Sequence, residues 1–162
     1  MEAANRGAVE GDGRTIGLNI GLPHEQRPNP YVTLELLFEF HCFFMRKLWF
    51  SHLGGALVVF PGGFVTLDEL FEVLTLARTK KLERQKIPIV LYGTSYWNEI
   101  INFEALVRHG TILRDDVKLF SFVDSPQEAL DLLKAKLPLD PEPTTPAFAK
   151  SRTSFKSEGD SH

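Results

Sequence analysis

The stretch ALVVFPGGFVTLDELFEVLTLAR, residues 56–78, carries the residue types and spacing that point most directly to chemistry. A short apolar run ends before Pro61, Gly62 and Gly63, and acids follow in the next turn. Glycines let backbone amides approach an anion closely, and the N-terminus of a helix adds partial positive charge. One interpretation is a phosphate site formed by Gly62, Gly63 and Thr66. The alternative is a tight turn that holds no ligand.

Glu69 has two competing interpretations. The run Thr66-Leu67-Asp68-Glu69 matches a capping box, in which threonine caps the helix and glutamate bonds back to it. In that case Glu69 is purely structural. In the other interpretation its carboxylate faces a ligand pocket at the carboxyl end of the preceding strand, where open α/β sheets collect ligands.

Arg46 and Lys47 are the cations of the almost wholly apolar stretch FHCFFMRKLWF. Paired cations on a helix usually face solvent, but a charge in apolar surroundings needs a buried partner or a ligand anion. This favours a ligand role for Arg46. The neighbouring His41 and Cys42 point about 100° apart on a helix, so they do not form a catalytic dyad, and we expect both to pack in the core.

The order of the predicted elements indicates an α/β fold with a parallel sheet and helices on its faces. The apolar run at 56–60 is expected to be a central strand. Strands are predicted at 16–20, 56–60, 87–92 and 119–123, and helices at 31–52, 66–81, 96–109 and in DSPQEALDLLKAKL. Residues 138–162 are rich in proline, serine and charge, and they are predicted to form a disordered tail.

The totals describe an ordinary globular chain. It has 162 residues, 24% of them charged, and a formal net charge of −3, which favours neither nucleic acid nor an anionic membrane as a partner. The single cysteine excludes an internal disulfide and a multi-cysteine metal site. The start is not a signal peptide, and no run has the roughly 18 apolar residues of a membrane helix. We therefore expect a soluble, cytoplasmic protein without a metal or cofactor.

Several motifs resemble one known family. PGGFVTLDE is similar to the PGGxGTxxE signature of the LOG family, and MRK at 45–47 looks like its second motif. MEAANRGA and IGLNIGLPHEQRPNPY also resemble family segments, so the resemblance covers roughly residues 1–135. It implies a Rossmann-like domain over 1–137 that hydrolyses nucleoside 5′-monophosphates, including cytokinin nucleotides, as a homodimer. The family's older label, lysine decarboxylase-like, is not supported, because no Schiff-base lysine motif for pyridoxal phosphate is apparent.

The resemblance assigns roles to individual residues. The 5′-phosphate would lie at the glycine turn and Thr66, while Glu69 and Arg46 would act in catalysis and ribose binding. The remaining candidates for the binding pocket are Lys47, Glu2 and Asn5.

Two departures from the family pattern predict a poor or inactive hydrolase. Val65 stands where the family has glycine, and the family's first strands and their glycine-rich loops are expected before Met1. The alternatives to an enzyme are a nucleotide-binding module without activity and an inactive fragment that dimerises.

Overall fold

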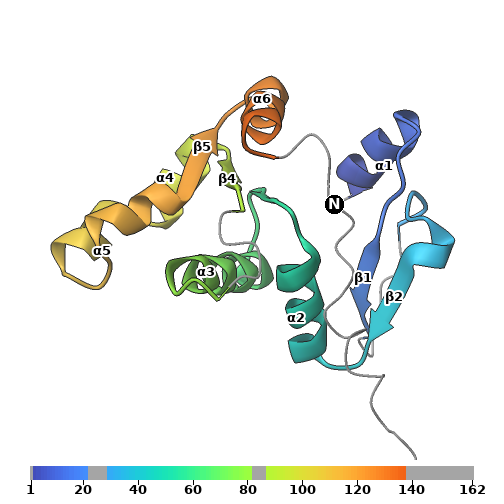
Figure 1. Ribbon diagram of the computed structural model, residues 1–162, viewed down its shortest axis with the longest axis horizontal. Helices are drawn as coiled ribbons and strands as arrows, with labels where there is room; N and C mark the ends of the chain where they lie inside the picture. Colours follow the sequence, from blue (N-terminus) through green and yellow to red (C-terminus); the bar gives the residue numbers. More distant parts are fainter. Residues whose placement is uncertain (1, 22–28, 82–86, 138–162) are drawn as a thin grey trace, which may run out of the picture.

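The computed structural model describes residues 2–21, 29–81 and 87–137 (Figure 1). The predicted disordered tail, 138–162, lies outside the described residues. The elements in order are α1 (Glu2–Glu10), β1 (Gly17–Ile20), η1 (Leu34–Leu36), β2 (Leu37–Phe40), α2 (Phe43–Leu53), β3 (Leu57–Val59), α3 (Phe64–Arg78), β4 (Ile89–Tyr92), α4 (Thr94–Ile100), α5 (Phe103–Arg108), η2 (Arg114–Leu119), β5 (Phe120–Val123) and α6 (Pro126–Lys136).

Three parallel strands form the main sheet in the order β3-β4-β5. Val58 pairs with Val90, and Val90 pairs with Ser121, so neighbouring strands run in the same direction. The predicted α/β fold with parallel strands is therefore confirmed. The expectation that 56–60 forms a central strand is wrong for the described residues, because β4 lies in the middle and β3 at an edge.

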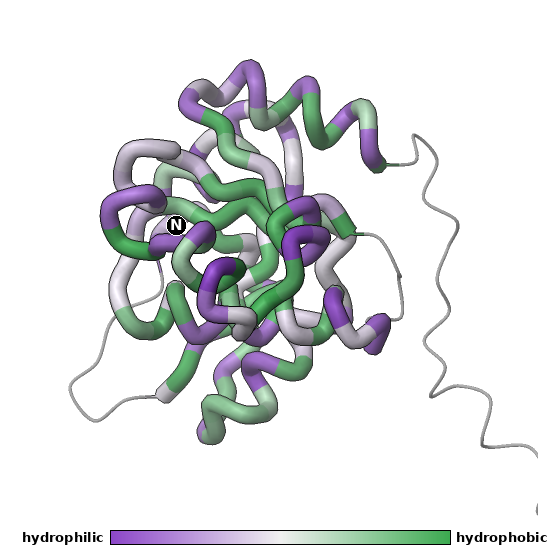
Figure 2. Tube along the Cα trace, turned by 90° about the vertical axis from the view of Figure 1, so that its left-hand side faces the viewer, coloured by the Kyte–Doolittle hydropathy of each residue, from purple (hydrophilic) through white to green (hydrophobic). Residues whose placement is uncertain are grey.

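Helices cover both faces of this sheet because β4 is apolar on both sides. Ile89 and Leu91 face the larger core, which includes Leu70 of α3 and the fully buried Trp97 of α4. Val90 points to the opposite face, where α6 packs with Ala129. In Figure 2 the hydrophobic segments run through the middle of the trace, while most hydrophilic segments lie on its outer coils.

The long helix predicted over 31–52 is wrong. Its first part forms η1 and β2, and β2 pairs in parallel with β1, with Leu18 opposite Phe38. The residues of β2, LFEF, are mostly apolar and aromatic, and such residues favour a strand when a partner strand is available. Only the second part, α2, is helical, and it contacts β1, β2 and α3 (Figure 1).

Two further differences concern helices. Residues 2–10 form α1, which the sequence patterns did not predict, and none of its side chains is buried. The single helix predicted over 96–109 is two helices, α4 and α5. Asn102 begins the second one, because its side chain accepts a hydrogen bond from the Ala105 amide at 2.8 Å.

Candidate functional site

The glycine turn connects the carboxyl end of β3 to α3. A Cβ on Gly62 would lie 2.8 Å from the Cβ of Thr66, so only glycine fits against the first turn of α3. A Cβ on Gly63 would meet no atom of the described residues within 4 Å, so this position is open on their side. The turn therefore leaves the N-terminus of α3 accessible on the side of Gly63, as a phosphate site needs.

The first turn of α3 does not form the predicted capping box. Gly63 is the N-cap, and the first ladder bond runs from the Leu67 amide to the Gly63 carbonyl at 3.0 Å. Thr66 is therefore already the third residue inside the helix, and no side chain among the described residues caps the terminus. The structural interpretation of Glu69 as a capping residue is wrong, because Glu69 lies in the second turn.

Glu69 instead pairs with Arg46 across two helices. Nη1 of Arg46 lies 2.8 Å from Oε1 of Glu69, and the two side chains are only 16% and 18% exposed. Nε of Arg46 also donates to the Leu18 carbonyl at 2.9 Å. Oε1 of Glu69 is buried, and the guanidinium covers it through an ion pair rather than through a well-aligned hydrogen bond. Within the part of the chain that the structure describes, these contacts use two of the five N–H donors of Arg46.

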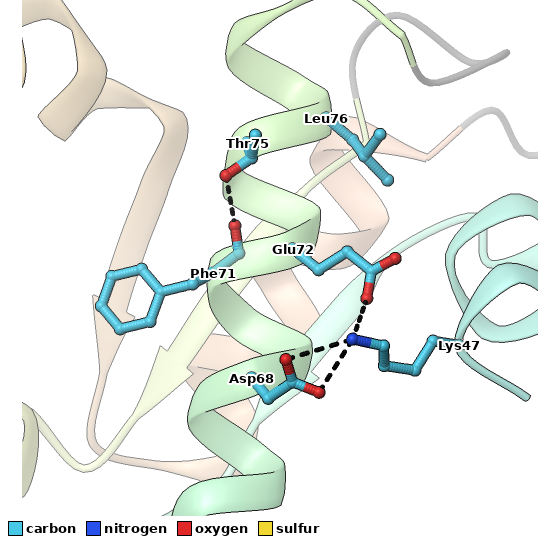
Figure 3. Close-up of a pocket in the computed structure, with 6 residues that line it drawn as sticks. All are labelled: Lys47, Asp68, Phe71, Glu72, Thr75 and Leu76. Carbon is cyan, nitrogen blue, oxygen red and sulfur yellow. Dashed lines mark hydrogen bonds and ion pairs between the residues drawn. The ribbon is translucent and has the colours of Figure 1, made fainter. Parts of the chain in front are cut away.

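Lys47, one residue further along α2, meets the neighbouring acids of α3. Its Nζ lies 3.0 Å from Oδ2 of Asp68 and 3.1 Å from Oε2 of Glu72 (Figure 3). The hydrogen bond to Asp68, followed by that to Glu72, raises the pKa of Lys47 above its usual value of 10.5. Lys47 is therefore a fixed cation that joins α2 to α3.

An open cavity of about 320 Å³ lies along α3, where Lys47 of α2 reaches it (Figure 3). Its lining comprises Lys47, Asp68, Phe71, Glu72, Thr75 and Leu76. Neither the glycine turn nor the Arg46–Glu69 pair lines it. The cavity is therefore distinct from the site that the sequence motifs predict, and the ion-paired Lys47, Asp68 and Glu72 form part of its wall.

The other predicted residues are dispersed. Glu2 is exposed and Asn5 is half-buried on α1, and no hydrogen bond or ion pair of the described residues joins either to Arg46 or Glu69. Their assignment to the pocket stays a prediction. The expectation of core positions for His41 and Cys42 is wrong, because both are exposed at the turn between β2 and α2.

Tyr96 is a residue near the glycine turn that no sequence motif marked. Its hydroxyl donates to the Gly62 carbonyl at 2.7 Å from the first turn of α4. The only signal in the sequence is an aromatic residue shortly after β4, whose carboxyl end lies beside that of β3 in a parallel sheet.

The described residues offer neither a metal cluster nor a membrane-spanning helix. No group of three or more histidine, cysteine, aspartate or glutamate side chains there is arranged to hold a metal ion. In the same part of the chain, no helix combines the length and the apolar character that crossing a membrane requires.

A family model described as "Possible lysine decarboxylase" matches residues 1–133, which contain the glycine turn, Arg46 and Glu69. A search of curated proteins found no match.

Proposed function

We propose a function on the premise that the chain belongs to the family described as possible lysine decarboxylase. Its site hydrolyses the N-glycosidic bond of a nucleoside 5′-monophosphate. The products are a free base and ribose 5-phosphate. The observation that carries the proposal is the half-buried Arg46–Glu69 pair, held beside an open glycine turn at the start of the same helix.

The spacing along α3 supports this substrate class. Gly63 and Glu69 are six residues apart, which corresponds to about 9 Å of helix rise. The Glu69 side chain leans toward the N-terminus of its helix, which shortens the separation between its carboxylate and a phosphate at the first turn. Thr66 and Glu69 are three residues apart and therefore lie on neighbouring positions of one helix face.

The reaction needs a negative charge near the ribose. Cleavage of a glycosidic bond passes through an oxocarbenium-like state, in which positive charge builds at C1′. The Glu69 carboxylate stabilises that charge and orients the attacking water. Arg46 holds Glu69 in place through the 2.8 Å ion pair and offers its remaining donors to the ribose hydroxyls or the phosphate.

Lysine decarboxylation, which the family description names, is a weaker candidate. Amino-acid decarboxylases of the usual type form a Schiff base between pyridoxal phosphate and a lysine, and the attacking amine must be neutral. Lys47, the neighbour of Arg46 in α2, is bound by two carboxylates that raise its pKa. This arrangement opposes a nucleophilic role.

The experiment measures release of free base from AMP and from a cytokinin riboside monophosphate. We compare the unmodified chain with Glu69→Gln and with Asp68→Asn, a control on the adjacent residue of α3. Glu69→Gln is expected to lower turnover by about 10²–10³-fold, the scale for a lost electrostatic stabiliser. Asp68→Asn is expected to retain the turnover of the unmodified chain.

The other outcomes separate the alternatives. AMP binding without base release would identify a non-catalytic nucleotide-binding module. Absence of both binding and release by the unmodified chain would contradict the proposal altogether.

A homodimer is the partner that fits the exposed apolar surface of α2. Five of its residues have large apolar side chains that are 37–69% exposed: Phe43, Phe44, Met45, Leu48 and Trp49. Several large apolar side chains exposed on one helix favour an interface, and most soluble oligomers join identical chains. Phe44→Glu is expected to convert a dimer into a monomer in light scattering, and a monomeric unmodified chain would contradict the assignment.

A further inference from the structure

Tyr96 connects the turn after β4 to the turn after β3. Its hydroxyl donates to the Gly62 carbonyl at 2.7 Å across 34 positions of sequence. The two turns are also packed together, because a Cβ on Gly93 would lie 3.5 Å from the ring of Pro61. The glycine turn therefore rests on the start of α4.

The start of α4, which carries Tyr96, is rigid. Trp97, which follows it, is fully buried, and its indole N–H donates to the Tyr92 carbonyl at 3.0 Å. Gly93 has a φ of +92°, which favours glycine, and its amide donates to the Val123 carbonyl at 2.8 Å. The Thr94 amide donates to Asp124 at 2.7 Å, so α4 is tied to the end of β5. Tyr96 thus presents its hydroxyl from a fixed position.

The contact determines how the Gly62–Gly63 peptide is oriented. The described residues contain no cis peptide bond, and in a trans peptide the carbonyl and the amide point in opposite directions. Because the Gly62 carbonyl points to Tyr96, the Gly63 amide points away from α4. The same contact occupies the Gly62 carbonyl, and the helix ladder starts only at the Gly63 carbonyl. The amides of the first turn therefore remain free of ladder partners, as at any helix N-terminus.

We propose that Tyr96 is a positioning residue for the phosphate group of the substrate. It acts through the Gly62–Gly63 peptide, whose amide it aims at the open side of the turn. This inference rests on the proposed function and adds a residue that determines affinity for the phosphate monoester as opposed to the unphosphorylated nucleoside.

The test uses Tyr96→Phe, which removes only the hydroxyl, and Tyr92→Phe as the matched control. Tyr92 ends β4, and its ring packs on Phe60 with centroids 4.9 Å apart. The Tyr96–Gly62 hydrogen bond is present with and without ligand, so its loss weakens binding only through the lost orientation of the Gly63 amide. The Kd for ribose 5-phosphate is therefore expected to rise in Tyr96→Phe by up to about three- to tenfold, the scale of one neutral hydrogen bond. The binding of ribose, which lacks the phosphate, and the properties of Tyr92→Phe are expected to stay unchanged.

Two readouts distinguish positioning from a structural role. The ¹⁵N–¹H resonance of Gly63 is expected to move in Tyr96→Phe and, in the unmodified chain, on addition of ribose 5-phosphate. The KM for AMP is expected to rise while kcat stays nearly unchanged, the pattern of an interaction equally strong in ground and transition states.

The possible failures are distinguishable. If the unmodified chain neither binds ribose 5-phosphate nor hydrolyses AMP, the proposed function fails, and this inference falls with it. If the unmodified chain binds and Tyr96→Phe binds equally well, only the role of Tyr96 is overturned. An equal loss of affinity for ribose and ribose 5-phosphate, with a lower melting temperature, also overturns it, because that result indicates a general packing role.

Discussion

Arg46 of α2 and Glu69 of α3 form an ion pair of 2.8 Å whose two side chains are less than one-fifth exposed. The same guanidinium donates to the Leu18 carbonyl of β1. One side chain thereby connects the two-stranded β1-β2 sheet with the helix that follows the glycine turn. The pair holds the carboxylate that the proposed reaction requires, so its disruption should affect both stability and activity.

Arg46→Lys is expected to lower both the stability of the fold and the activity of the site. A lysine carries a single ammonium group, and it cannot reproduce the fork that reaches Glu69 and Leu18 together. Loss of one charge-assisted hydrogen bond is expected to lower the free energy of unfolding by about 1.5–3 kcal/mol. Chemical denaturation measures the change. The control is Arg78→Lys, whose ion pair with Asp116 is nearly half exposed on the arginine side and should cost much less. Equal effects of the two variants would contradict a special role for Arg46.

Gly63→Asp is expected to separate stability from phosphate binding. The position has room for a side chain, and aspartate is a good N-cap that also complements the helix dipole. The free energy of unfolding should stay equal or rise by a few tenths of a kcal/mol. Binding of ribose 5-phosphate, measured by calorimetry, should be lost because the carboxylate repels the phosphate.

Gly63→Asn provides the matched neutral control. It caps the helix with the same geometry but without a charge, so it should retain much of the affinity for ribose 5-phosphate. If Gly63→Asp binds ribose 5-phosphate as well as Gly63→Asn does, the phosphate does not lie at this turn.

Val65→Gly is expected to destabilise the chain without improving phosphate affinity. Among the described non-glycine residues only Asp12 and Lys80 have positive φ, so Val65 occupies its place in α3 without that strain. Its side chain is 53% exposed, and glycine inside a helix costs about 0.5–1 kcal/mol in unfolding free energy. Thermal melting and ribose 5-phosphate titration measure the two effects. A clear gain in affinity would show that Val65 crowds the phosphate, as its difference from the family signature predicts.

The contribution of Lys47 to stability is expected to be constant between pH 6 and 9, because this range lies below its pKa and the ammonium group stays charged. Asp68 and Glu72 raise the folded-state pKa above the usual 10.5, so the contribution is fully present below about pH 10.5 and is lost as the pH rises through the raised value. The measurement is the difference in melting temperature between the unmodified chain and Lys47→Met across this range. A difference that already shrinks between pH 6 and 9 would contradict the assignment of the ion pairs.

The sequence by itself determined the features that depend on neighbours along the chain. An unbroken apolar run, two glycines and a periodic apolar segment were sufficient to predict β3, the glycine turn and most of α3. The alternation of such segments predicted the parallel α/β fold, because parallel strands need a crossover connection between them.

Only the tertiary structure decided the features that depend on residues far apart. Pairing with β1 makes residues 37–40 a strand, although their local apolar pattern also fits a helix. The helix start at Gly63 and the ion pair with Arg46 decide that Glu69 is not a capping residue. The contact between Tyr96 and Gly62 crosses from one strand connection to the next. Such contacts depend on how elements pack, and local propensity carries no information about which distant partner will meet a given side chain.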